Sequence, residues 1–226
     1  MTAKLKKLWK NEYIQTATII GLIVLIFFGL WFGATLALNN PNPIVVVPSG
    51  SMCIPYDGAC EYYLWDHPFD RTLHVGDLLV LQGVDPRSLN TQYPNSDIIV
   101  FHNPNNPEEL IVHRIVTAEE RDGVLYFRTK GDGNPTTRWP NTPQPSEYDP
   151  WARPSEPGVA QDQVVGKVIM RIPWLGNVVL YMRTQAGLLL VAVLITLLIV
   201  IEFVVPVLRK KTQSPTEPHV EKGKAP

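Results

Sequence analysis

Two long apolar runs frame the chain. Residues 16–38 carry no charge, and residues 186–208 carry a single one, Glu202. A hydrocarbon core of about 30 Å needs roughly 20 helical residues, so each run is long enough to span it. The first run also exceeds the apolar stretch of ~7–15 residues typical of a signal peptide, which favours a retained anchor. We therefore predict two transmembrane helices, with a separate domain over residues 39–185 between them.

Short stretches rich in Val, Ile, Leu and aromatic residues predict strands in this domain. They are separated by Gly, Pro, Asn and Asp, as is typical of strands joined by turns. The stretches cover residues 44–48, 77–84, 97–102, 111–118, 123–129 and 164–171. The turn Asp122-Gly123 should join the fourth and fifth of them as a hairpin. Because no stretch from 44 to 171 has helical periodicity, we predict a mostly β domain.

Residues 133–158 contain seven of the 21 prolines of the chain. Such a density excludes a regular strand or helix, because proline fixes φ and lacks an N–H donor. We predict an extended surface loop there, packed by Trp139, Tyr148 and Trp151. The polar tail, residues 209–226, is predicted to be disordered.

The net charge of −1 hides a strong asymmetry along the sequence. The N-terminal segment, residues 1–15, and the tail, residues 209–226, are basic, whereas residues 39–185 hold 11 basic and 17 acidic residues. Basic residues outside both apolar runs predict a protein of the cell membrane whose termini are both cytoplasmic and whose domain over residues 39–185 is extracytoplasmic. The acidic domain has no basic face for nucleic acid, so binding of that kind is not expected.

The stretch "VVVPSGSMCIP", residues 45–55, contains the candidate nucleophiles. Ser49 and Ser51 lie in a glycine-containing turn directly after a strand. A serine hydroxyl is a weak nucleophile that needs a base within hydrogen-bond reach and donors for the developing oxyanion. The candidate bases are His67, His74, His102, His113, Lys130 and Lys167.

His113 lies in the apolar run "LIVHRIVT", where alternation gives it the same face as Ile111 and Ile115. A buried core histidine and a catalytic base both fit this position. Asp132 follows the strand that should pair with the strand of His113, so it could orient the histidine. An Asx-type turn accounts equally well for Asp132.

The two cysteines, Cys53 and Cys60, both lie in the domain expected outside the cytoplasm. An even pair in that compartment favours a disulfide bond, which here would brace the turn next to the serines. Two cysteines and one spare histidine do not make a convincing metal site, and no metal is expected.

Five motifs in order resemble those of type I signal peptidases, most of all the archaeal and endoplasmic-reticulum branch. They are "PSGSM", "VGDLLVL", "SDIIVFHNP", "IVHRIV" and "TKGDGNP". The resemblance covers Pro48 to Pro135, and weaker similarity extends over residues 164–176. It implies a catalytic domain of coiled antiparallel sheets beside membrane anchors, and it leans toward an archaeal source.

The resemblance also implies roles for single residues. Ser51, followed by methionine, matches the family nucleophile, and Ser49 matches a serine that helps to form the oxyanion hole. His113 stands where bacterial enzymes have a lysine base, and Asp132 matches the aspartate of the "KGD" motif. The family also has a second aspartate a few residues later, for which Asp149 in "EYDPW" is the candidate here.

Two departures from the family pattern concern the site. "SMCIP" has one residue more before the proline than is usual, and Thr136, Thr137 and Arg138 stand where the second aspartate is expected. The acid that orients His113 is therefore either Asp132 or Asp149.

The expected function is that of a membrane-bound serine endopeptidase. It would remove N-terminal signal peptides from secretory preproteins, after small residues and through an acyl-enzyme, without a cofactor. Its expected partners are those preproteins, membrane lipid and the Sec translocon. Two alternatives remain: a regulatory peptidase with a Ser–Lys pair that uses Lys130, and a non-catalytic anchored β-domain that binds envelope or translocon partners.

Overall fold

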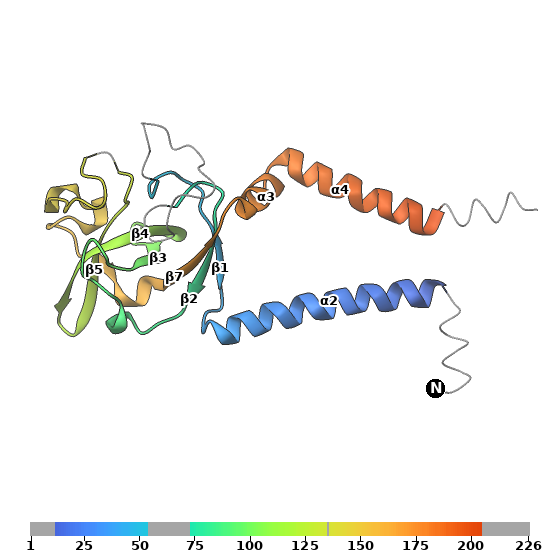
Figure 1. The fold of residues 1–226 in the computed structure, drawn as a ribbon, viewed down its shortest axis with the longest axis horizontal. Coiled ribbons are helices and arrows are strands. Elements are labelled where there is room, and N and C mark those ends of the chain that lie inside the picture. Colours follow the sequence, from blue (N-terminus) through green and yellow to red (C-terminus); the bar gives the residue numbers. More distant parts are fainter. Residues whose placement is uncertain (1–11, 54–72, 135, 205–226) are drawn as a thin grey trace, which may run out of the picture. The chain divides into compact units, whose positions relative to one another are not determined.

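The computed structural model of the protein describes residues 12–53, 73–134 and 136–204 (Figure 1). Its β domain is a seven-stranded antiparallel sheet with the order β1-β2-β7-β3-β4-β5-β6. The strands are β1 (Ile44–Val46), β2 (Leu78–Gln82), β3 (Ile98–Asn103), β4 (Asn106–Arg121), β5 (Val124–Lys130), β6 (Val159–Ala160) and β7 (Val164–Ile172). Each of the six predicted stretches overlaps a strand, which confirms the mostly β domain.

β4 is the strand that organises the site. Its first half pairs with β3, where His113 lies opposite Ile99, and its second half pairs with β5 from Arg114 onward. The predicted hairpin between β4 and β5 is confirmed. Its turn residues Asp122 and Gly123 have φ values of 50° and 79°, the left-handed conformation that an Asp-Gly turn accommodates.

The two faces of the sheet each carry an apolar cluster. Alternate residues of β3 divide between them: Ile98 and Val100 join the first cluster, whereas Ile99 and Phe101 join the second. The first cluster consists of Val47, Met52, Leu73, Leu79, Leu81, Ile98, Val100, Val112 and Val168. The second consists of Leu89, Ile99, Phe101, Ile115, Phe127 and Val159. Burial of each large side chain contributes about 1.5–3 kcal/mol, so these clusters supply much of the stability of the domain.

The proline-rich segment runs as irregular chain with two short 3₁₀ turns, η2 (Pro145–Glu147) and η3 (Pro150–Ala152). Arg128 of β5 ties it down, because its Nη1 donates to the carbonyls of Ala152, Arg153 and Glu156. Trp139 Nε1 donates to the Pro94 carbonyl, and Trp151 packs against the second cluster. The predicted tryptophan packing of this loop is thus confirmed for Trp139 and Trp151.

The described residues also form three α-helices: α2 (Glu12–Ala37), α3 (Leu175–Met182) and α4 (Gln185–Ile199), the last continued by the π-helical turn η5 (Val200–Val204). Ile14–Ala37 and Gln185–Glu202 are long and apolar enough to cross a membrane. The chain divides into two compact units, up to Val178 and from Val179 onward. The predicted disordered tail and most of the basic N-terminus lie outside the described residues.

Candidate active site

The serine turn is fixed by its backbone and by the residue that follows Ser51. Cys53 N–H donates to the Gly50 carbonyl across the turn, and Gly133 N–H donates to the Ser51 carbonyl. Met52 is fully buried in the first cluster, where its Sδ accepts the N–H of Asp132. The turn is therefore anchored on both sides of Ser51, whose own side chain remains partly exposed.

Ser51, His113 and Asp149 form one continuous hydrogen-bonded chain. Ser51 Oγ lies 2.9 Å from His113 Nε2, and His113 Nδ1 lies 2.6 Å from Asp149 Oδ2. A carboxylate oxygen accepts hydrogen bonds, so we assign the imidazole proton to Nδ1 and leave Nε2 as the acceptor of the serine hydroxyl proton. This is the tautomer that a general base next to a serine nucleophile requires.

Asp149 reaches His113 from the proline-rich segment. Its N–H donates to the Thr129 carbonyl at 3.0 Å, and its carbonyl accepts the N–H of Ala152 in η3. Pro150 is well suited to the first position of such a turn, where its missing N–H costs nothing. Asp149 is almost fully buried, so its carboxylate is shielded from water.

Asp132, the first expectation for the partner of His113, forms an ion pair with Arg114 instead. Its carboxylate accepts from Nε and Nη2 of Arg114 at 2.8–3.0 Å. The reason is the pleat of β4: His113 and Arg114 are consecutive, so their side chains point to opposite faces, and Asp132 lies on the face of Arg114. Of the two aspartates considered as partners of His113, Asp149 therefore makes the contact, and Asp132 pairs with Arg114. Burial raises the pKa of the Asp132 carboxyl, and the Arg114 guanidinium opposes that shift.

The other candidate bases in the described chain have partners other than the serines. His74 lies next to Asp77 and Arg171, and His102 Nδ1 lies 2.6 Å from the Pro107 carbonyl. The two lysines are equally engaged. Lys130 Nζ donates to the carbonyls of Gly131, Asn134 and Thr137, and Lys167 Nζ pairs with Asp97. Burial lowers the pKa of Lys130. His67 lies outside the described residues.

Ser49 and Cys53 flank the candidate nucleophile. Ser49 Oγ lies 3.4 Å from Ser51 Oγ, so both hydroxyls lie on the same side of the turn. Cys53 is buried and disulfide-bonded, whereas Cys60, the other cysteine of the sequence, lies outside the described residues. The pairing of these two cysteines stays a prediction.

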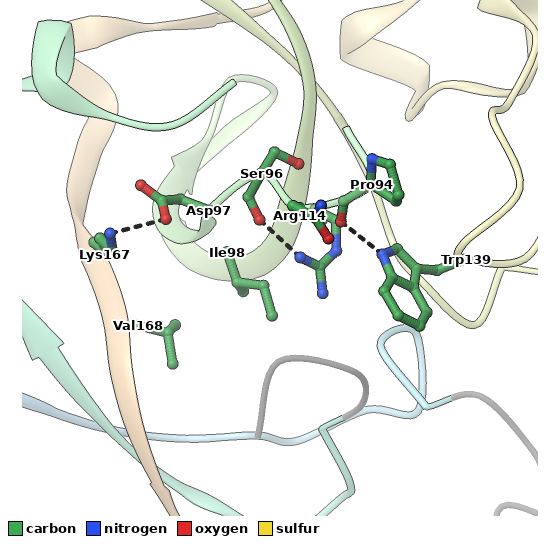
Figure 2. A pocket seen from close by; sticks show the side chains of 9 residues that line it. Pro94, Ser96, Asp97, Ile98, Arg114, Trp139, Lys167 and Val168 are labelled. Atoms are coloured by element: carbon green, nitrogen blue, oxygen red, sulfur yellow. Dashed lines mark hydrogen bonds and ion pairs between the residues drawn. The ribbon is translucent and has the colours of Figure 1, made fainter. Parts of the chain in front are cut away.

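A cavity of about 160 Å³ lies on the Arg114 face of β4 (Figure 2). Arg114 is held there between the Ser96 carbonyl, to which it donates at 2.7 Å, and the Trp139 ring, whose centroid is 5.4 Å from Cζ. The second cation of the cavity wall, Lys167, is paired with Asp97. None of Ser51, His113 and Asp149 lines this cavity, so it is separate from the hydrogen-bonded chain.

Three residues around the site carried no functional expectation from the sequence. Thr129 donates to Asp149, Trp151 packs beside His113, and Arg114 neutralises Asp132. In the structure Thr129 lies opposite Ile115 and diagonal to His113, because a β-bulge between Ile115 and Thr117 shifts the register of the hairpin by one residue. A regular hairpin from the Asp122-Gly123 turn would pair Thr129 with Val116 on the other face, so the sequence did not predict this contact.

An antiparallel β domain that brings a serine, a histidine and an aspartate into one hydrogen-bonded chain, in a protein with two apolar helices, defines a membrane-associated serine protease. No family model matches the chain. It is similar to signal peptidase complex catalytic subunits from several eukaryotes. The sec11 protein of Dictyostelium discoideum is 31% identical over 175 residues, which cover 77% of this chain and 79% of that relative.

Two fungal relatives give the same result. SEC11 of Verticillium alfalfae is 28% identical over 158 residues, or 70% of this chain and 74% of the relative. SEC11 of Tuber melanosporum is 27% identical over 177 residues, which cover 78% of this chain and 82% of that relative. The chain belongs to the family of signal peptidase catalytic subunits, the eukaryotic and archaeal type of type I signal peptidase.

Proposed function

We propose that Ser51, His113 and Asp149 are the catalytic triad with which this signal peptidase cleaves preproteins through an acyl-enzyme. The observation that best supports this proposal is the hydrogen-bonded chain of the three side chains, with 2.9 Å between Ser51 Oγ and His113 Nε2 and 2.6 Å between His113 Nδ1 and Asp149 Oδ2. Ser51 Oγ attacks the scissile carbonyl while His113 Nε2 takes its proton. His113 then protonates the leaving amine, and water hydrolyses the acyl-enzyme. Asp149 holds the Nδ1 proton and stabilises the imidazolium.

The oxyanion is stabilised by the Ser51 N–H and the Ser49 hydroxyl. The distance of 3.4 Å between Ser49 Oγ and Ser51 Oγ supports this role, because a donor for the oxyanion has to lie beside the attacking oxygen. Asp132 supports the serine turn without contacting the reacting atoms. Its N–H donates to Met52 Sδ, and the N–H of the neighbouring Gly133 donates to the Ser51 carbonyl. Its carboxylate is neutralised by Arg114.

The substrates are secretory preproteins that bind as extended strands, with small side chains at the first and third positions before the cut. Two strand edges support this mode of binding. β1 (Ile44–Val46) is at the end of the sheet, and β4 pairs only with β3 before Arg114. An extended peptide can add to such an edge through main-chain hydrogen bonds, beside Ser51 and His113.

The helices over Ile14–Ala37 and Gln185–Glu202 anchor the enzyme in the cell membrane. Both termini are cytoplasmic and the β domain is extracytoplasmic, an orientation supported by the basic residues that flank the two apolar runs. Anchoring raises the effective concentration of preproteins that emerge from the Sec translocon. The named relatives are eukaryotic, so the archaeal source stays a prediction.

The test is cleavage of a purified signal-bearing preprotein by the full-length, detergent-solubilised enzyme and by its Ser51→Ala variant. We expect the wild type to release a product whose signal peptide ends at a small residue, as read by mass spectrometry. The variant should yield no product, although its tryptophan fluorescence and melting temperature match those of the wild type. Equal cleavage by both proteins would show that Ser51 is an ordinary turn serine.

A further inference from the structure

Two residues outside the triad, Thr129 of β5 and Trp151 of the proline-rich segment, contact it from behind. Thr129 Oγ1 donates to Asp149 Oδ2 at 2.8 Å, and Trp151 Nε1 donates to Thr129 Oγ1 at 3.2 Å. We propose that Thr129 and Trp151 are positioning residues that fix Asp149 and His113 in the reactive geometry. The proposal deepens the proposed triad and rests on it.

Thr129 holds Asp149 at two points. Its carbonyl accepts the N–H of Asp149 at 3.0 Å, and its hydroxyl donates to the carboxylate. Thr129 is itself fully buried and paired with Ile115 in the sheet, so it cannot follow movements of the loop. The two contacts transfer the rigidity of β5 to a carboxylate that the irregular chain alone would leave free to rotate.

The chemistry of the donors sets the direction of every hydrogen bond in this chain. An indole N–H only donates, so the Thr129 oxygen accepts from Trp151 and its own proton is directed to Asp149. Asp149 Oδ2 then accepts two hydrogen bonds, one from Thr129 Oγ1 and one from His113 Nδ1. The imidazole is thereby kept in the tautomer that leaves Nε2 free to take the proton of Ser51.

Trp151 supports the triad in a second way. Its ring stacks on the imidazole of His113, with centroids 6.3 Å apart and planes inclined by 21°. It also contacts Phe101 of the second cluster, edge to face with centroids 6.0 Å apart. A ring held between the core and His113 limits rotation of the imidazole about χ2, while the indole N–H holds Thr129.

The charged groups around this pair are few, and the proposed test leaves them unchanged. Lys130 interacts electrostatically with Asp149, and Asp132 interacts electrostatically with His113. Arg114 in turn pairs with Asp132, and Glu147 interacts electrostatically with Lys130. Trp151, which stacks on His113, carries no charge, and neither do the residues of the second cluster against which it packs.

The decisive comparison is Thr129→Val against Thr129→Ser in the full-length enzyme. Valine keeps the volume and loses the hydroxyl, whereas serine keeps the hydroxyl. A hydrogen bond to a charged group is worth one to two orders of magnitude in an equilibrium. We expect Thr129→Val to lower kcat for preprotein cleavage about 10-fold or more, with KM within about twofold, because Thr129 does not touch the substrate.

The pH profile supplies a readout that a purely structural role would not move. A carboxylate that has lost the Thr129 donor holds the Nδ1 proton of His113 more tightly. The acid limb of the kcat/KM profile should therefore move to higher pH in Thr129→Val and return toward the wild-type position in Thr129→Ser. A wild-type rate and profile in Thr129→Val, or an equal loss in both variants, would overturn the proposal.

Trp151→Phe keeps an aromatic ring beside His113 but removes the indole N–H, together with part of the ring. It carries the test if Thr129→Val does not fold, as judged by its melting curve. We expect a loss in kcat of about threefold or more and a shift of the acid limb in the same direction; an unchanged rate and profile would count against the proposal. Ser51→Ala, assayed in parallel, separates a failure of the proposed triad from a failure of the positioning role. Residual cleavage there refutes the triad, whereas an inactive Ser51→Ala with an unaffected Thr129→Val refutes only the positioning role.

Discussion

Asp149 Oδ2 accepts a hydrogen bond from His113 Nδ1 at 2.6 Å and a second one from Thr129 at 2.8 Å. One oxygen thus joins the proline-rich segment to two strands of the sheet. Since Asp149 is buried, the position of this oxygen is set by those donors rather than by water. The geometry of the candidate base is therefore determined as much by the loop as by the strand that carries His113.

The identity of the general base can be tested with two single variants. His113→Ala should lower the rate of preprotein cleavage on the order of 10⁴-fold or more, because no other described side chain bonds to Ser51 from the position of a base. Lys130→Met should retain activity, because Lys130 Nζ is bound to three carbonyls. An active His113→Ala combined with an inactive Lys130→Met would favour a Ser–Lys pair.

Lys130 also predicts a pH dependence of stability. Burial lowers its pKa from the ordinary value of 10.5, so the folded protein releases this proton at a lower pH than the unfolded chain does. Between the two pKa values the unfolded state binds more protons, and the free energy of unfolding of the wild type rises with pH. Urea titrations at pH 8 and pH 10.5 should show the wild type gaining stability relative to Lys130→Met. A constant difference between the two proteins would contradict the shift.

The close approach at Gly131 predicts a steric effect on the site. A Cβ there would lie 2.5 Å from the Ser51 carbonyl oxygen and 2.9 Å from His113 Nε2. Gly131→Ala should therefore displace both groups and lower kcat by about 100-fold, as misplacements of about 1 Å do. Gly123→Ala is the matched control: it has φ of 79° but open space around the Cβ, so it should cost about 1 kcal/mol of stability and leave kcat unchanged. Equal activity of the two variants would refute the crowding.

The strands and the hairpin could be predicted because their signals are local. Alternation in "GVLYFRTK" and the turn Asp122-Gly123 predicted the β4–β5 pairing, whereas the bulge between Ile115 and Thr117, which makes Thr129 a diagonal neighbour of His113, was not predicted. The strand β6 was not predicted, because Val159–Ala160 is too short to carry a periodic pattern. Its position depends on Arg128, which binds the segment before it through three carbonyls.

The acid partner of His113 could not be chosen from the sequence, for a physical reason. Asp132 is close to the His113 strand along the hairpin, and this made it the first expectation. Which face a residue just beyond a strand end occupies depends on the tertiary fold. Arg114, buried on the opposite face from His113, attracts the Asp132 carboxylate. Asp149 reaches His113 instead, because of the path of the proline-rich segment, and that path has no periodic sequence pattern from which it could be predicted.

The ion pair of Asp132 with Arg114 predicts a loss of stability rather than of chemistry. Both side chains are at most 3% exposed, so Asp132→Asn leaves a buried guanidinium without its counter-charge. The cost should be about 3–5 kcal/mol in the free energy of unfolding. Urea unfolding followed by tryptophan fluorescence measures it. An unfolding midpoint equal to that of the wild type would mean that water or another group replaces the carboxylate.

The rate of preprotein cleavage by Asp149→Asn, compared with that by Asp132→Asn at a temperature where both are folded, decides which aspartate orients His113. We predict a loss on the order of 10⁴-fold in kcat for Asp149→Asn, because an amide at this position favours the wrong tautomer of His113. Asp132→Asn should stay within about 10-fold of the wild type, because its carboxylate binds Arg114 and not His113. The reverse order, with Asp132→Asn inactive and Asp149→Asn active, would contradict the triad of Ser51, His113 and Asp149.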